Sequence, residues 1–353
     1  MSSKEVIILG IESSCDDTSC AIIKNGVLLS NVTANQKIHE QYGGVVPELA
    51  SRDHQKNIVP VVDAAIKKAG VNVSQISAIA FTRGPGLSGS LLVGMSFAKS
   101  LSMALNIPLI EVNHMQAHIL AHFIRSEKQL PNTEHRIPDT EHRTPNFPFL
   151  CLTVSGGHTQ LVKVNDYLSF ELLGETIDDA VGEAFDKAAK ILGLPYPGGP
   201  LIDKYAQLGD AIKFSFSKSK VEGLNYSFSG IKTSFLYFIQ NHLKENPKFI
   251  EENLNDICAS YQNHLIKTLL KNLIEASLQL NIKQIAIAGG VSANSELRKQ
   301  ITELGKKLNW EVFIPPFEFC TDNAAMIAIT GHYKFLKKDF CDLSIVPLAQ
   351  YSI

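Results

Sequence analysis

The sequence predicts an α/β protein whose two halves begin in the same way. Each half opens with an apolar run, a polar turn and a second apolar run, at residues 6–11 and 20–23 in the first half and at residues 149–154 and 159–164 in the second. Apolar runs of this length, bounded by turn residues, are typical of buried strands. Helical patterns follow both pairs, and a further strand at residues 284–288 ends in another glycine-rich turn. We therefore expect two α/β domains of related design.

The composition sets limits on the class of protein. The 353 residues suffice for two domains of ordinary size, and 45% of them are hydrophobic against 19% charged. The formal net charge of −2 means that a nucleic-acid partner requires a local basic patch or a second protein that supplies one. The six cysteines contain no C-x-x-C pair, as expected for reduced thiols. No signal peptide or membrane span is evident, so we expect a cytoplasmic protein.

In the first half, strands and helices alternate after an opening hairpin. The return strand at residues 27–32 follows an Asn-Gly pair at 25–26, which is typical of a tight hairpin turn. A long helix begins with a proline and ends at a glycine, over residues 47–70. A strand at 76–81 then leads through a glycine-rich turn into a helix at 91–105. This order predicts a sheet flanked by helices.

In the second half, polar or glycine-rich turns precede most helices. A carboxylate-rich helix begins within residues 178–187, and a glycine turn at 196–200 precedes another helix. A long helix at 256–280 leads into the strand at 284–288. The last helix starts within residues 320–328, and Asp322 lies near its N-terminal cap.

Residues 126–148 separate the two halves. Thr-Glu-His-Arg-Ile-Pro at 133–138 is nearly repeated as Thr-Glu-His-Arg-Thr-Pro at 140–145, with few apolar residues and several prolines. We expect a surface loop in which His135 and His142 are not metal ligands. The predicted domains are therefore residues 1–125 and 149–353, and the last helices, about 322–337, are expected to pack back on the first domain.

His114 and His118 lie four residues apart on a predicted helix. Side chains at this spacing share one helix face, so two imidazoles can bind one metal ion at about 2.0–2.1 Å, the distance for zinc. An isolated pair is equally compatible with two ordinary helix histidines. The H-E-x-x-H metalloproteases use the same spacing with a glutamate as general base, but Met115 occupies that position here. A metal at this pair would therefore support chemistry other than peptide hydrolysis.

Two turns carry more polar or glycine residues than a connection requires. Residues 12–19 between the first two strands contain Glu12, Asp16 and Asp17 beside three serines. The alternative is an ordinary solvated turn without a catalytic role. Residues 155–157 form a Ser-Gly-Gly turn in the second half, where glycine lets backbone amides approach a phosphate closely. Both turns are candidates for substrate chemistry.

The combined motifs resemble those of the TsaD family (also called YgjD or Gcp), which lies within the actin/Hsp70/sugar-kinase superfamily. The resemblance covers almost the whole chain. The matching motifs are GIESSCDDT at 10–18, GGVVPELASRDH at 43–54, TRGPGL at 82–87, NHMQAH at 113–118, VSGGHT at 154–159, DDAVGEAFDK at 178–187, YPGGP at 196–200, GGVSAN at 289–294 and CTDNAAMIA at 320–328. The departure is the insertion near residues 126–147, where the family usually has a shorter link.

The resemblance implies duplicated ribonuclease-H-like domains with a metal and nucleotide cleft between them. It also implies an N6-L-threonylcarbamoyladenine synthase, which transfers the threonylcarbamoyl group from threonylcarbamoyl-AMP to N6 of adenosine 37 in tRNAs reading codons that begin with adenine. A TsaB-like paralogue and a TsaE-like ATPase are the implied protein partners, and residues 43–66 are the expected contact with the paralogue. The implied cofactor is one divalent metal per subunit, Fe2+ in the family's usual description, with zinc as the alternative.

Site residues carry over by position. The resemblance implies that His114, His118 and Asp322 are metal ligands, that Asp16 is the catalytic carboxylate, and that Glu12 is a second candidate for that role. The residues implied to hold the adenylate are Val154, Ser155, Gly156, Gly157, His158, Asp186, Gly199, Asp203 and Asn294. In such a reaction a carboxylate can accept the amine proton while a metal polarises a carbonyl or a phosphate oxygen.

Three rival functions make different demands on the same residues. A kinase or ATPase of the superfamily would use magnesium, which prefers oxygen ligands to the histidines at 114 and 118. A metalloprotease would need a base in place of Met115, and a non-catalytic nucleotide-binding scaffold would be favoured by loss of the donor-binding residues, which are intact. For tRNA, the candidate basic patch is the segment 213–232 with Lys213, Lys218, Lys220 and Lys232, although a solvated basic surface fits it equally well.

Overall fold

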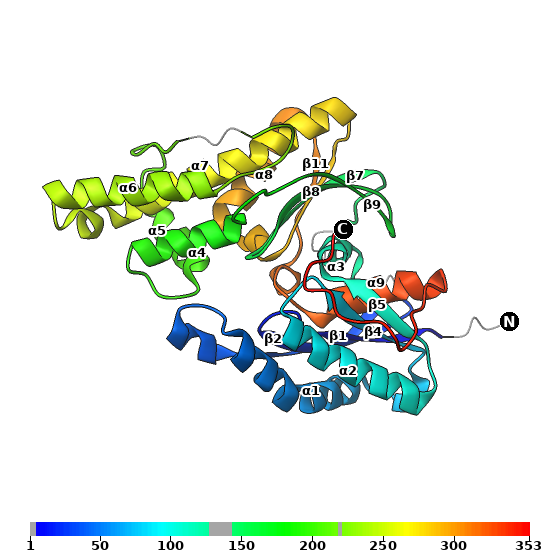
Figure 1. Ribbon diagram of the computed structural model, residues 1–353. Helices are drawn as coiled ribbons and strands as arrows, with labels where there is room; N and C mark the ends of the chain where they lie inside the picture. The colour runs from blue at the N-terminus through cyan, green and yellow to red at the C-terminus, as the bar shows by residue number, and fades with distance from the viewer. Residues whose placement is uncertain (1–4, 127–142, 218–220) are drawn as a thin grey trace, which may run out of the picture. The chain divides into compact units, whose positions relative to one another are not determined.

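The computed structural model describes residues 5–126, 143–217 and 221–353, and it divides into two compact units (Figure 1). The first unit takes its described residues from Met1–Thr144, Tyr167–Ser169 and Thr321–Ile353, and the second from Pro145–Asp166 and Phe170–Cys320. Each unit is therefore discontinuous in sequence. His135, His142, Lys218 and Lys220 lie outside the described residues.

The first unit contains a mixed sheet in the order β5-β4-β1-β2-β3-β6. Strands β1, β2 and β3 pair antiparallel, β1 pairs parallel with β4 and β4 with β5, and β6 adds parallel to β3. The strand bounds are β1 Ile7–Glu12, β2 Asp17–Lys24, β3 Val27–Asn35, β4 Ala78–Gly84, β5 Leu109–Asn113 and β6 Arg125–Ser126. Because β1, β4 and β5 run parallel, their carboxyl ends meet at one edge of this sheet.

Helices cover both faces of the first sheet (Figure 1). Successive side chains of a strand point to opposite faces, and the odd-numbered residues of β1 pack with α1 and α2 in one apolar cluster. Gly10 faces α9 instead, and a Cβ there would lie only 2.7 Å from the carbonyl oxygen of Ala324. Glycine at position 10 thus lets α9 approach β1 closely. The helix bounds in this unit are η1 Lys37–Tyr42, α1 Pro47–Ala69, η2 Val73–Gln75, α2 Ser88–Leu105, α3 His114–Leu120, η3 Ala121–Phe123 and α9 Ala324–Leu336.

The second unit repeats the strand order of the first, as β11-β10-β7-β8-β9. Strand β7 pairs antiparallel with β8 and parallel with β10, which in turn pairs parallel with β11. The bounds are β7 Phe149–Val154, β8 Thr159–Asp166, β9 Ser169–Glu175, β10 Gln284–Ala288 and β11 Glu311–Phe313. The prediction of two domains of related design is confirmed at the level of sheet topology.

The helices of the second unit enclose a separate apolar core around Leu152, Phe235 and Tyr261. Their bounds are α4 Val181–Ile191, α5 Gly198–Ala206, α6 Ser229–Glu245, α7 Phe249–Leu280, η5 Gly290–Ala293, α8 Ser295–Leu308 and η6 Phe317–Phe319. Helix α7 begins seven residues before the predicted start at 256, and α6 occupies a segment for which the sequence predicted no helix. Among the described residues, no helix is long and apolar enough to cross a membrane.

Candidate functional site

The histidine helix α3 begins directly after β5, at the carboxyl edge of the first sheet. Asn113 is its N-cap, and the side-chain oxygen of Asn113 accepts the backbone N–H groups of Met115 at 2.9 Å and Gln116 at 3.2 Å. Capping of this kind satisfies amides that the first helical turn leaves unpaired. The cap thereby fixes the first residue of α3, and with it the positions of His114 and His118 on the helix.

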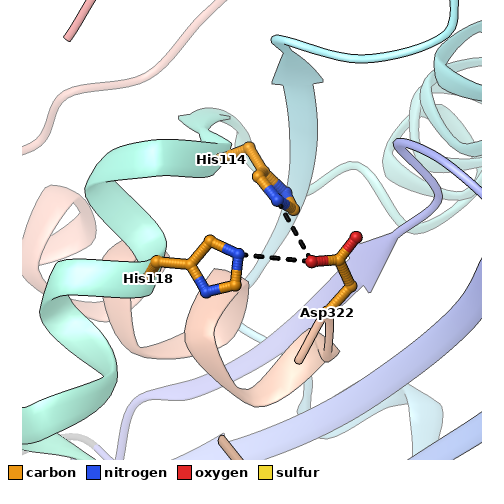
Figure 2. A group of neighbouring side chains, drawn as sticks. All are labelled: His114, His118 and Asp322. Carbon is orange, nitrogen blue, oxygen red and sulfur yellow. Dashed lines mark hydrogen bonds and ion pairs between the residues drawn. The ribbon is translucent and has the colours of Figure 1, made fainter. Parts of the chain in front are cut away.

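Asp322 meets both histidines at one point (Figure 2). Its Oδ1 lies 3.3 Å from Nε2 of His114 and 3.2 Å from Nε2 of His118. The carboxylate comes from the segment just before α9, whose N-cap Asn323 accepts the N–H of Met326 at 3.0 Å. All three residues lie in the first unit, because α9 packs on the first sheet.

Behind His114 lies a second carboxylate. Oε2 of Glu12 is 3.0 Å from Nδ1 of His114 and accepts a hydrogen bond from the Thr82 hydroxyl at 2.7 Å. The other oxygen, Oε1, accepts the backbone N–H of Ser14 at 2.5 Å. Glu12 is the last residue of β1 and Thr82 lies near the end of the neighbouring parallel strand β4, so the sheet register brings them together.

The local charges favour a cation at this point. Burial lowers the pKa of His114, but the charges of Asp322 and Glu12 outweigh it and hold that pKa well above its ordinary value. Burial raises the pKa of Asp322, but the charge of His114 and the hydrogen bonds from both histidines outweigh burial. The net pKa is below its ordinary value, so this carboxylate is ionised. Burial lowers the pKa of His118, which therefore presents a neutral imidazole. A neutral imidazole and an ionised carboxylate are the forms that bind metals.

The three residues fit a divalent transition metal. One ligand atom from each lies within 4.8 Å of the others. Ligands at about 2.1 Å from one ion are separated by about 3.0–3.4 Å in octahedral or tetrahedral geometry, and the observed 3.2 and 3.3 Å separations fall in that range. Two imidazoles and one carboxylate form a donor set used by non-haem Fe(II) and by zinc.

Asp16 and Asp17 lie in the same unit but outside this group. Asp16 is half-buried in the turn between β1 and β2, and Asp17 is the first residue of β2. Burial, and then the neighbouring charge of Asp16, raise the pKa of Asp17 to about 7. The Asp17 carboxylate also accepts a hydrogen bond from the Asn35 amide at 2.7 Å. Two neighbouring carboxylates therefore lie at the start of β2, and that of Asp17 holds its proton more tightly than an ordinary aspartate.

In the second unit, the Ser155–His158 turn joins β7 to β8. The backbone N–H of Ser155 donates to the His158 carbonyl at 2.8 Å, and the N–H of His158 donates to the Ser155 hydroxyl at 3.1 Å. A Cβ added to Gly156 or Gly157 would meet no atom of the described residues within 4 Å. Packing within the second unit therefore does not require glycine at either position.

Two further contacts join predicted adenylate residues of this unit. The Asp186 carboxylate accepts the N–H groups of Gly198 at 2.8 Å and Gly199 at 3.1 Å, which fixes the start of α5. Gln262 on α7 donates to Asp203 at 3.1 Å and accepts from the Asn294 amide at 2.7 Å. Asp186 with Gly199, and Asp203 with Asn294, thus form two hydrogen-bonded groups.

Three participants were not predicted from the sequence: Ser14 and Thr82 around Glu12, and Gln262 between Asp203 and Asn294. Thr82 begins a quoted motif, so its position carried a signal. Gln262 lies inside a long helix without a motif, and only the folded structure shows that it is 3% exposed and connects α5 with the N-cap of α8.

Comparisons with known proteins agree with these motifs. The family model for TsaD, tRNA N6-adenosine threonylcarbamoyltransferase, matches residues 27–329. A protein of that name from Christiangramia forsetii is 61% identical over 351 residues, covering 99% of each chain. Its namesake from Riemerella anatipestifer is 58% identical over 350 residues, again covering 99% of each chain. A solved structure of full-length HypF has a TM-score of 0.59 at 14% identity, covering 93% of this chain and 46% of that one, and shows the fold alone.

Proposed function

We propose that this chain, which belongs to the TsaD family of tRNA N6-adenosine threonylcarbamoyltransferases, transfers a threonylcarbamoyl group from threonylcarbamoyl-AMP to N6 of adenosine 37 in tRNAs reading codons that begin with adenine. The observation that carries the proposal is the 61% identity to a transferase of that name over 99% of both chains. The chain is accordingly a transferase that forms threonylcarbamoyladenosine. The proposal adds that its donor is threonylcarbamoyl-AMP.

The donor and acceptor set the chemical demands. Threonylcarbamoyl-AMP is a mixed anhydride, so AMP is a good leaving group, whereas the lone pair of an exocyclic adenine amine is delocalised and nucleophilically weak. Attack of N6 on the carbamoyl carbon forms the C–N bond, the bond to the phosphate oxygen breaks, and the amine loses one proton. No covalent protein intermediate is required.

The chain's own residues are proposed to divide this work. Backbone amides of the turn from Val154 to His158 hold the phosphate of the adenylate, and the groups of Asp186 with Gly199 and Asp203 with Asn294 shape the rest of its site. Asp16, half-buried and close to Asp17, accepts the amine proton. These roles are supported by the hydrogen-bonded turns and by the carboxylate pair.

His114, His118 and Asp322 are proposed to hold one divalent metal, Fe2+ or alternatively zinc. When bound, such an ion supplies a Lewis acid that polarises a carbonyl or stabilises a phosphate oxygen. The supporting observation is the convergence of two Nε2 atoms and one carboxylate oxygen.

The proposed partners are tRNA, a TsaB-like paralogue that binds along residues 43–66, and a TsaE-like ATPase, in the cytoplasm. Helix α1 supports the second of these, because Val59 on its surface is 60% exposed. An exposed apolar side chain on a long helix is compatible with a protein contact, although single ones are common.

The function is tested by reconstitution. Purified chain with its partners, threonylcarbamoyl-AMP and unmodified tRNA should yield threonylcarbamoyladenosine, detected by mass spectrometry of nucleosides. Cells depleted of the protein should lose that nucleoside. Unchanged nucleoside content in depleted cells would overturn the function, and product formed only when ATP and carbamoylation enzymes are added, never from the purified adenylate, would overturn the donor.

A peptidase function predicts the opposite result. We expect no metal-dependent cleavage of a peptide library, because Met115 stands where such enzymes carry their glutamate base. Cleavage that requires the metal and disappears in His118→Ala would contradict this expectation.

A further inference from the structure

We propose that Glu12 is a positioning residue of the metal group: it orients His114 and fixes its tautomer, and it is not the base of the transfer reaction. This inference rests on the proposed metal site. It replaces the expectation that Glu12 is a second candidate for the catalytic carboxylate.

The surroundings of Glu12 prevent its carboxylate from acting as the general base. Its side chain is 0% exposed. Three donors already approach its two oxygens: Nδ1 of His114 at 3.0 Å, the Thr82 hydroxyl at 2.7 Å and the Ser14 amide at 2.5 Å. A general base must come within hydrogen-bond reach of the proton it abstracts, and a carboxylate enclosed by protein donors cannot reach a substrate amine.

The same contacts determine which nitrogen of His114 is free. An ionised carboxylate only accepts hydrogen bonds, so Nδ1 of His114 must donate to Glu12. In the neutral ring, which is the form that binds a metal, the lone pair is then on Nε2, and this is the atom that lies 3.3 Å from Asp322. Glu12 and Asp322 therefore stand at opposite ends of one imidazole, with Glu12 on the side away from the metal ligand.

His118 provides an internal contrast. Within the part of the chain that the structure describes, its Nδ1 is buried without a hydrogen-bond partner. Its ring contacts Asp322 through Nε2 at 3.2 Å and the edge of the His114 ring, whereas the His114 ring has Glu12 behind it. Carboxylates behind ligating histidines typically contribute 10–100-fold to metal affinity. We expect this contribution to come mainly through His114.

Glu12→Gln is the most informative substitution because it keeps the shape. If the new amide group faces Ser14, two N–H donors oppose each other. If it faces His114, Nδ1 has to accept instead of donate, which puts the proton on Nε2 and blocks the metal ligand. Either orientation disturbs the contacts of the side chain that orients His114, so metal binding should weaken. If Glu12 were only the general base, the same substitution would leave metal binding unchanged.

The test uses Co2+ as a spectroscopic probe bound to the full-length chain. Affinity is measured by competition with a chelator, and the visible absorption of the bound ion reports its ligand geometry. We expect Glu12→Gln to bind Co2+ about 10–100-fold more weakly, with an altered spectrum. Asp16→Asn, the matched carboxylate substitution in the next turn, should lose transfer activity and keep the wild-type affinity and spectrum.

Activity provides a second readout. Excess metal should restore much of the transfer rate of Glu12→Gln, which it could not do if the variant lacked a base. Should Glu12→Gln fail to fold, Thr82→Val decides, since it removes one donor to Oε2 of Glu12 and should weaken Co2+ binding several-fold. If the wild-type chain binds Co2+ and the folded variant binds it with the same affinity, the inference about Glu12 is wrong and the proposed metal site still stands. A wild-type chain that binds no Co2+ overturns the proposed metal site as well.

Discussion

Single residues distinguish packing from ligand binding at the glycine turns. A Cβ on Gly157 meets no described atom within 4 Å, whereas a Cβ on Gly182 would lie 2.5 Å from the Ser155 carbonyl oxygen. We predict that Gly157→Val folds with a melting temperature close to wild type but binds a non-hydrolysable threonylcarbamoyl-adenylate analogue at least about tenfold more weakly, because the branched side chain occupies the approach to the backbone. Calorimetry measures this affinity.

Gly182→Ala is the matched comparison for that experiment. Its added methyl group meets backbone, so we expect a clear loss of thermal stability instead. Unchanged analogue affinity in a folded Gly157→Val variant would show that the turn does not hold the adenylate.

Asp17 should make stability depend on pH. Its carboxyl has a pKa of about 7 in the folded chain against an ordinary 3.8, so the folded state binds the proton more tightly than the unfolded state. Stability therefore declines as the pH rises from about 4 to about 7, and the cost is complete above that range. We predict that Asp17→Asn raises the free energy of unfolding at pH 8 by on the order of 1–3 kcal/mol, a discounted value because the group is only partly buried.

At pH 4 the same substitution should have little effect, because Asp17 is then protonated in the folded state. Urea unfolding at the two pH values measures the difference. An equal effect of Asp17→Asn at pH 4 and pH 8 would exclude a raised pKa as the cause.

The metal residues also show how far the sequence could predict a site. Helical spacing paired His114 with His118, but Asp322 is separated from His118 by 204 positions, and only the family resemblance joined them. No spacing rule could place Glu12 against His114, because that contact depends on the register of parallel strands. Residues close in sequence were thus predictable from local geometry, and their enclosing groups were not.

At the level of elements, the C-terminal segment holds the start of the histidine helix. The side-chain amide of Asn113, the N-cap of α3, donates to the carbonyl oxygens of Tyr351 at 3.3 Å and Ser352 at 3.0 Å. The Tyr351 hydroxyl donates to the Glu111 carboxylate at 3.1 Å, and the Leu348 N–H donates to a carbonyl of β4 at 2.9 Å. The segment therefore connects the ends of β4 and β5.

We predict that deletion of Leu348–Ile353 lowers stability by roughly 1–4 kcal/mol, since each lost hydrogen bond contributes about 0.5–1.5 kcal/mol. Thermal unfolding measures this loss, and weaker Co2+ binding should accompany it because the cap of α3 loses support. Deletion of Ser352 and Ile353 alone removes a single acceptor for Asn113 and should have a smaller effect. Equal stability of the full-length and the longer-deleted chain would show that the segment does not support α3.

Helices were predicted correctly where proline or glycine marked their ends. Helix α1 begins at Pro47 and ends before Gly70, as the sequence predicted, and the glycine there has a φ of 63°. Helix α6 was missed because its apolar residues, among them Ile231, Phe235 and Ile239, follow a segment rich in serine, phenylalanine and lysine. Its N-terminal residues are held by Asp178, which accepts the N–H groups of Phe228 and Ser229 from 50 residues away. A distant cap of this kind leaves no local signal.

At the scale of the whole molecule, the two units share one strand order, and the fold is similar to that of HypF. Two similar strand openings made this predictable. Residues 321–353 join the first unit through close packing of α9 on β1, the domain on which about residues 322–337 were expected to pack. Gly10 permits that packing, but its small size alone does not identify the helix that it meets.

The charge of the whole chain bears on how it binds tRNA. The net charge is −2, and electrostatic affinity scales with the number of phosphates that the protein neutralises. Within the candidate patch 213–232, the two described lysines already have carboxylate partners. Lys213 pairs with Asp256 at 2.7 Å, and Lys232 pairs with Asp179 at 2.9 Å. These pairs reduce the positive charge that the patch offers to a phosphate backbone.

We therefore predict that the isolated chain binds tRNA weakly at physiological salt, and that the proposed assembly with its protein partners binds more tightly and with a steeper salt dependence. Fluorescence anisotropy across a salt series measures both quantities. Charge reversal at Lys218 and Lys220 tests the remaining part of the patch and should reduce the salt slope of the assembly by about two if both neutralise phosphates. An isolated chain that matched the assembly in affinity and salt slope would show that this protein binds tRNA without help, despite its negative net charge.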